Sequence, residues 1–165
     1  MMDFHPRLLA VLLAISACER GEASADIPHV GTEQSTTLAL AAAETPGGIA
    51  VDIAYARQAS SEAPRMAELL IDVDGPVAHE RSERLDAAAR AGKDVVVLPR
   101  DDGSLRVLVF TTQNLTRLDS GPLARLHLRR TGPGPVRFEL VGQPTIFAPP
   151  EANTAVTLGP AVSLP

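Results

Sequence analysis

The chain has 165 residues, of which 45% are hydrophobic, and this is the length and apolar content of one folded domain with one core. Its formal net charge of −5 argues against a nucleic-acid phosphate backbone as partner. Aromatic residues are scarce, with four Phe, one Tyr and no Trp, so we expect the core to be built from aliphatic side chains.

The N-terminus has the layout of a secretory signal. Arg7 precedes an apolar run over residues 8–15, and small residues then lead to Cys18. The apolar run is far shorter than the roughly 18 residues that a membrane-spanning helix needs. The pattern therefore predicts a signal peptide over residues 1–17 and an exported protein.

Cys18 is the only cysteine, so it cannot form an intramolecular disulfide. The tetrad Ile15-Ser16-Ala17-Cys18 resembles the bacterial lipobox. This resemblance implies that Cys18 is lipidated, becomes the mature N-terminus and anchors the protein to a bacterial membrane, facing the periplasm or the cell surface. One acyl chain holds a protein only marginally, whereas two or more anchor it stably. The alternative is cleavage by an ordinary signal peptidase near the same place, which would leave a soluble exported protein.

Composition divides the rest of the chain into three parts. Residues 18–37 are polar and rich in small side chains, which predicts a flexible tether. Residues 38–160 carry the apolar patterning of a single domain without internal repeats, and residues 161–165 are expected to fray.

Within this domain, apolar and polar residues mostly alternate with the period of two that is typical of half-buried strands. Turn signals rich in Gly, Pro and Asp separate the runs. Many short strands with such punctuation indicate an all-β, antiparallel sandwich of the jelly-roll kind. The alternating runs are Ile49–Tyr55, Ala67–Val73, Leu105–Phe110, Arg125–Arg129, Arg137–Leu140 and Val156–Leu158.

Two stretches depart from alternation. The continuous apolar run Val95–Leu98 indicates a strand covered on both faces. Residues Glu80–Ala91 have a period near 3.6, with Leu85 and Ala88 on one stripe, and Gly92 stands where a helix C-cap belongs. We therefore expect one short helix within residues 80–91.

The order of these patterns resembles the cohesin-like and carbohydrate-binding-module-like sandwiches of bacterial exported proteins. The resemblance lies in the early strand Ile49–Tyr55, in the strand that opens after a glycine turn at Gly103–Phe110, and in the turn and strand of Ser120–Leu128 preceded by Asn114. It implies non-catalytic binding, because cohesins dock a partner module and their relatives bind polysaccharide. It offers no catalytic residues.

Motifs for metal, cofactor or covalent chemistry are not found. A calcium loop that starts at Asp72 would place Pro76 and Val77 at its fifth and sixth positions, where the sixth needs glycine. His29, His79 and His127 have no partner at metal-ligand spacing. No G-x-S-x-G elbow is present. We therefore predict no enzyme, no metal and no cofactor, with a small paired-carboxylate hydrolase as a minor alternative.

Two features of the surface are candidate binding sites. We expect Tyr55, Phe138 and Phe147 in the core, whereas alternation places Phe110 opposite the core face, so sugar stacking would depend on Phe110. Arg125, His127 and Arg129 form a basic strip along one strand, which could meet an anionic partner or could simply be solvated. The sequence thus predicts a lipid-anchored, non-enzymatic envelope module that docks a protein, with polysaccharide binding as the alternative.

Overall fold

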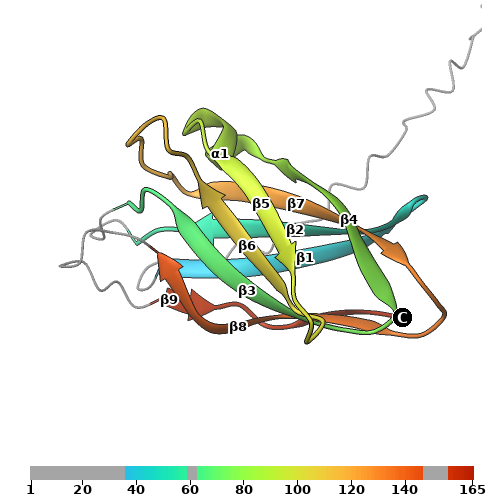
Figure 1. Ribbon diagram of the computed structural model, residues 1–165. Coiled ribbons are helices and arrows are strands. Elements are labelled where there is room, and N and C mark those ends of the chain that lie inside the picture. Colours follow the sequence, from blue (N-terminus) through green and yellow to red (C-terminus); the bar gives the residue numbers. More distant parts are fainter. Residues whose placement is uncertain (1–35, 59–62, 147–155) are drawn as a thin grey trace, which may run out of the picture.

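The computed structural model describes residues 36–58, 63–146 and 156–165, and these form a sandwich of two β-sheets (Figure 1). This confirms the predicted all-β class. Ten strands and one short helix are described. In chain order they are β1 (Thr36–Thr45), β2 (Gly48–Ala56), β3 (Ala67–Asp74), β4 (Val77–Arg84), α1 (Asp86–Arg90), β5 (Asp94–Pro99), β6 (Leu105–Phe110), β7 (Gly121–Arg130), β8 (Val136–Ile146), β9 (Val156–Leu158) and β10 (Val162–Leu164).

Each sheet has five strands. The first sheet has the order β4-β7-β2-β1-β9, and the second has the order β10-β8-β3-β6-β5. Every pairing is antiparallel except that of β1 with β9. Apart from the hairpins β1–β2 and β5–β6, the paired strands are separated in sequence by other elements.

The core lies between the sheets and is aliphatic, as the composition predicts. Leu69 on β3 faces Val107 on β6, and both are almost completely buried. Tyr55 and Phe138 are the buried aromatic residues that the structure describes, in agreement with their expected core positions. Burial raises the pKa of Tyr55 to about 12, because the phenolate would lose its water. Phe147, also expected in the core, lies outside the described residues.

The short helix is confirmed, but it covers less of the chain than the periodicity indicated. α1 begins at Asp86 rather than at Glu80, because Val77–Arg84 pairs with β7 as strand β4. The register of β4 shifts between His79 and Arg81. Gly92 follows the helix with a φ of 62°, the left-handed conformation expected of a residue that ends a helix.

The strand with the continuous apolar run lies in an unexpected place. β5 is the edge strand of the second sheet, and Leu98 is 44% exposed, so the expectation of a strand covered on both faces was wrong. Its inner side chains, Val95 and Val97, pack on the core, while Val96 and Leu98 lie on the outer face. The continuous apolar run therefore arises because one side of this edge strand packs on the core and the other side lies on an apolar outer surface.

The boundaries of the domain also differ slightly from those expected. β1 begins at Thr36, within the expected tether, and both Thr36 and Thr37 are buried. Val162–Leu164, expected to fray, forms β10 against β8. Among the described residues, no helix is long and apolar enough to cross a membrane.

Candidate functional site

The outer face of the second sheet carries a set of apolar side chains, which we call the apolar face. Strand pairing brings them together: Leu70 lies opposite Val141, and Val96 lies opposite Leu108. All are at least partly exposed to solvent. The apolar face comprises Leu70, Val96, Leu98, Leu108, Phe110 and Val141.

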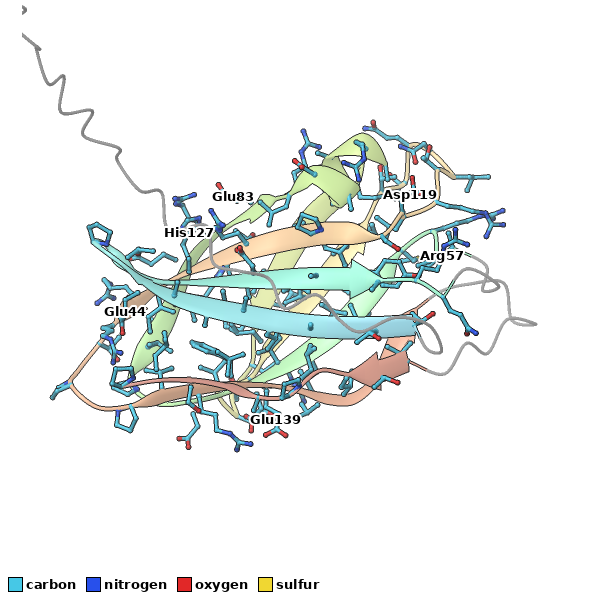
Figure 2. The ribbon with its side chains drawn as sticks, turned by 180° about the vertical axis from the view of Figure 1, so that it is seen from behind. Glu44, Arg57, Glu83, Asp119, His127 and Glu139 are labelled. Carbon is cyan, nitrogen blue, oxygen red and sulfur yellow. The ribbon has the colours of Figure 1, made fainter. Side chains whose placement is uncertain are left out.

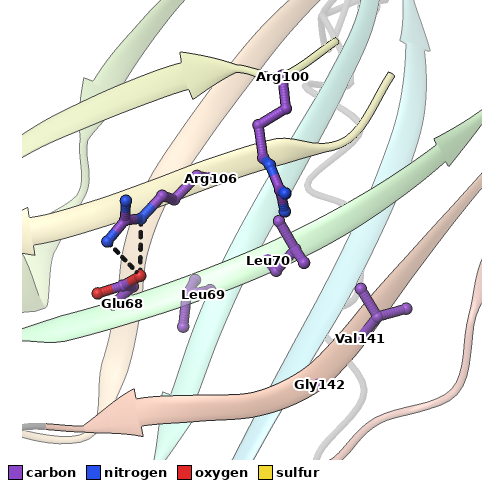
Figure 3. A pocket seen from close by; sticks show the side chains of 7 residues that line it. All are labelled: Glu68, Leu69, Leu70, Arg100, Arg106, Val141 and Gly142. Atoms are coloured by element: carbon purple, nitrogen blue, oxygen red, sulfur yellow. Dashed lines mark hydrogen bonds and ion pairs between the residues drawn. The ribbon is translucent and has the colours of Figure 1, made fainter. Parts of the chain in front are cut away.

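A shallow hollow of about 370 Å³ opens within this face (Figure 3). β8 forms one side of it, where the pairing with β3 is irregular between Glu68 and Leu70. Gly142 has a φ of 73°, and no atom lies close to the position that a Cβ would take, so the glycine leaves this side of the hollow open. The residues that line the hollow are Glu68, Leu69, Leu70, Arg100, Arg106, Val141 and Gly142.

An ion pair crosses the middle of the apolar face. Arg106 Nε and Nη2 lie 2.7 Å and 2.6 Å from the same oxygen, Glu68 Oε1 (Figure 3). The hydrogen bonds from Arg106 to Glu68 raise the pKa of the guanidinium. The pair is neutral as a whole, so it interrupts the apolar face without giving it a net charge.

Charged residues surround the apolar face. Arg137 and Glu139 pair at 2.7 Å on β8, and Arg84 reaches Asp94 at 3.5 Å at the other edge. In the turn before β6, hydrogen bonds from Ser104 lower the pKa of Asp102. The apolar side chains therefore surround a central ion pair, and further charged residues lie at the rim.

The outer face of the first sheet also carries paired charges, and these lie along β7. Arg125 donates two hydrogen bonds to Asp52, of 2.6 Å and 2.8 Å. Arg129 lies 3.1 Å from Glu80. The predicted basic strip is therefore flanked by carboxylates along its length, which reduces its attraction for an anion.

His127 completes this strip. Its Nε2 is 3.4 Å from Glu83 Oε1 on β4, and Figure 2 shows the two side chains together on this face. Its Nδ1 lies 3.3 Å from Arg81 Nη2. In the described part of the chain, Nε2 of His127 and Nε2 of the neighbouring His79 are both buried without a hydrogen-bond partner. Burial lowers the pKa of His79. Both imidazoles are partly buried rather than freely solvated.

The predicted site residues thus lie on different faces of the molecule. Phe110 lies at the end of β6 on the apolar face, opposite Asp94, whereas Arg125, His127 and Arg129 lie on the first sheet. Cys18 lies outside the described residues. Among residues 36–58, 63–146 and 156–165, no group of three or more His, Cys, Asp or Glu side chains could hold a metal ion.

No protein-family model and no curated protein sequence matches the chain. Solved structures do match it. A non-cellulosomal cohesin from the hyperthermophilic archaeon Archaeoglobus fulgidus is 15% identical, with a TM-score of 0.55 over 76% of this chain and 86% of the cohesin. The chain has a cohesin-like fold.

Two further cohesin structures agree. A cohesin module from a Clostridium perfringens family 33 glycoside hydrolase is 14% identical, with a TM-score of 0.56 over 79% of this chain and 96% of the module. A chain of a type I cohesin–dockerin complex from Clostridium thermocellum is 11% identical, with a TM-score of 0.57 over 76% of this chain and 94% of its own length. Identities this low establish the fold alone.

Sequence reasoning missed most of the apolar face. Leu108 and Phe110 are visible as a second apolar set that alternates with the core residues of β6. The other members come from β3 and β5, which lie on either side of β6, and from β8, which lies beyond β3, and this order is known only from the sheet. The sequence does carry one signal of this face, because some strands have apolar residues on both sides. It does not identify which strands are their neighbours.

Proposed function

We propose that this chain is a non-enzymatic docking module that binds a protein partner through the apolar face of its second sheet. The observation that supports this most directly is the contrast between the two outer faces. Ion pairs lie on both outer faces, but the second sheet also leaves six apolar side chains partly exposed. Two of these side chains, Leu70 and Val141, line the hollow. The cohesin-like fold supports a docking role, because several of the similar structures are cohesin–dockerin complexes.

The apolar face has the anatomy expected of a protein interface. Interfaces place apolar anchors in a centre that becomes dry on binding, and charged residues at a rim that stays wet. Leu70, Leu108 and Val141 would provide anchors around the Arg106–Glu68 pair, and the hollow, lined by both apolar and charged residues, would accept one partner side chain. A dockerin-like module is the partner class that the similar structures suggest.

Polysaccharide binding is less well supported. Sugar rings stack on exposed aromatic faces, and Phe110 is the one aromatic residue outside the core among the residues that the structure describes. It is partly buried and stands alone at the end of β6. A single aromatic side chain offers a small platform for a polymer.

The proposed location rests on the N-terminal sequence. Ile15-Ser16-Ala17-Cys18 supports a lipid anchor at Cys18, which would hold the docking domain at a bacterial membrane through residues 18–35. Cys18→Ser should abolish incorporation of labelled fatty acid, because serine cannot form the thioether that carries the lipid. Equal labelling of the wild type and the variant would contradict the lipobox assignment.

Docking is tested by affinity capture with two matched variants. Leu70→Glu places a carboxylate in the middle of the apolar face, and Arg129→Glu makes a surface change on the first sheet. We expect the wild type and Arg129→Glu to retain the same protein from an envelope extract, and Leu70→Glu to lose it. The captured protein is then purified, and its affinity is measured by calorimetry; a loss of at least tenfold is expected for Leu70→Glu alone.

Two outcomes would overturn the proposal. Loss of binding with Arg129→Glu but not with Leu70→Glu would move the site to the predicted basic strip. Retardation of the wild type in gels that contain a glycan, abolished by Phe110→Ala, would instead support polysaccharide binding.

A further inference from the structure

The only lysine in the chain, Lys93, is buried at the junction of α1 and β5. Lys93 is 1% exposed, and all the other basic residues of the Lys and Arg type in the chain are arginines. A guanidinium stays protonated in proteins, whereas a buried lysine can lose its proton and become a nucleophile. At this buried position the chain therefore has a lysine, whose amine can lose its charge, rather than an arginine.

The amine of Lys93 has one hydrogen bond in the described part of the chain. Nζ donates to Asn114 Oδ1, at 3.0 Å. An ammonium carries three donors, and leaving donors buried without acceptors is costly. Burial, and after it the positive charge of Arg65, lower the pKa of Lys93. Both effects favour the uncharged amine.

The side chain of Asn114 is held with its carbonyl toward this amine. Oδ1 also accepts a hydrogen bond of 3.0 Å from the backbone N–H of Thr116, and Nδ2 donates to Gly92 O at 3.4 Å. These two bonds fix the orientation of the amide. The Thr116 N–H also stabilises negative charge on Oδ1, as a donor in an oxyanion hole does.

We propose that Lys93 and Asn114 react to form an intramolecular isopeptide crosslink. The lone pair of Nζ attacks Cγ of Asn114, the Nζ–Cγ bond forms, and the Cγ–Nδ2 bond breaks. The proton that Nζ gives up leaves with Nδ2 as ammonia, so no oxidant or further reactant is needed. Cγ lies one C=O bond, about 1.2 Å, beyond Oδ1. A small rotation of the lysine side chain therefore brings the amine toward the reactive separation of about 3–3.5 Å.

The surrounding backbone holds the two residues together. Lys93 N donates to Ala88 O at 2.9 Å, and Leu118 N donates to Pro64 O at 2.7 Å, which fixes the segment that carries Asn114. In the described residues neither side chain forms a hydrogen bond or an ion pair with a carboxylate. Proton transfer then depends on the amine itself and on water at the half-buried Asn114, so we expect the reaction to be slow and to require the folded state.

Tryptic mapping of the full chain tests the crosslink directly. Trypsin does not cleave after an acylated lysine, so the linked product joins Ala91–Arg100 to Val107–Arg117 with the mass of both peptides less one ammonia. The folded wild type, sampled through a long incubation, should accumulate this branched peptide. A sample incubated in denaturant should yield only the separate peptides.

Two variants serve as controls. Lys93→Met keeps an unbranched apolar stem without the amine, and Asn114→Ala removes the amide; neither should form the branched peptide. Circular dichroism establishes that each variant is folded, and the crosslinked wild type should melt at a higher temperature than the wild type before incubation. Folded wild type that releases only the separate peptides after the full incubation would overturn the proposal, as would the branched peptide in either variant.

Discussion

At the scale of single residues, Asp52 is the clearest example of a charge placed by the fold. It is 7% exposed on the outer face of β2, between the alanines of β1 and Arg125 on β7. Two hydrogen bonds from Arg125 satisfy its carboxylate, and they raise the pKa of the guanidinium. A carboxylate with so little water needs such a partner, and the partner comes from a strand more than 70 residues away.

Asp52→Ala should therefore destabilise the protein more than the loss of an exposed ion pair does. We expect about 1–3 kcal/mol, because hydrogen bonds to charged groups in partly buried sites are lost. Glu80→Ala, which removes the exposed partner of Arg129, should cost no more than about 1 kcal/mol. Urea unfolding followed by circular dichroism measures both changes. Equal costs would show that the Asp52 pair is as weak as a surface pair.

At the scale of elements, the sequence predicts the strands that have a clear buried side, and it misses the edge strands β4 and β10 and the interior strand β1. β2, β3 and β6 follow from alternation, because each has a clear buried side. β4 was predicted as helix from Glu80 onward, since an edge strand tolerates charged residues and its register shift breaks the period of two. β10 has only three residues and exists through its pairing with β8.

The same limit applies to the candidate site. The apolar residues of β6 can be read from the sequence, but the face they belong to depends on the pairing of β6 with β3 and of β3 with β8, which are distant in sequence. Alternation shows which residues share a side of one strand. It does not show which strands lie side by side, or which outer face remains uncovered.

Because of His79 on the edge strand β4, we expect the protein to lose stability in mild acid. Burial lowers the pKa of His79 below the value of about 6.5 that it has when unfolded. Between the folded and unfolded pKa values the unfolded chain binds more protons, so stability rises with pH in this window and is lost as the pH falls below about 6.5. The midpoint of urea unfolding should decrease from about pH 8 to about pH 5, above the range in which most carboxylates titrate.

His79→Gln is the control for this effect, since glutamine is polar but does not titrate. Its unfolding midpoint should change less over the same pH range than that of the wild type. An identical decrease in both proteins would assign the pH dependence to other groups.

At the scale of the whole molecule, the pleat of the second sheet places the residues that stabilise the fold on one side and the residues of the proposed docking surface on the other. Successive residues of β3 point to opposite sides: Ile71 faces the core and is fully buried, while Leu70 lies on the apolar face. One strand thus contributes to folding with one side and to the proposed docking with the other. Substitutions at neighbouring positions should therefore have different consequences.

The same change made at these two positions tests this separation. Ile71→Glu places an unpaired carboxylate in the core and should cost about 3–5 kcal/mol, a large share of the 5–15 kcal/mol that holds a domain together. Leu70→Glu faces solvent opposite Arg106, so its cost should stay within about 1 kcal/mol. Urea unfolding and affinity for the captured partner, measured on both variants, should show Ile71→Glu lowering stability and Leu70→Glu lowering affinity while the fold remains intact. Comparable losses of stability would mean that the outer face is part of the core rather than a surface open to a partner.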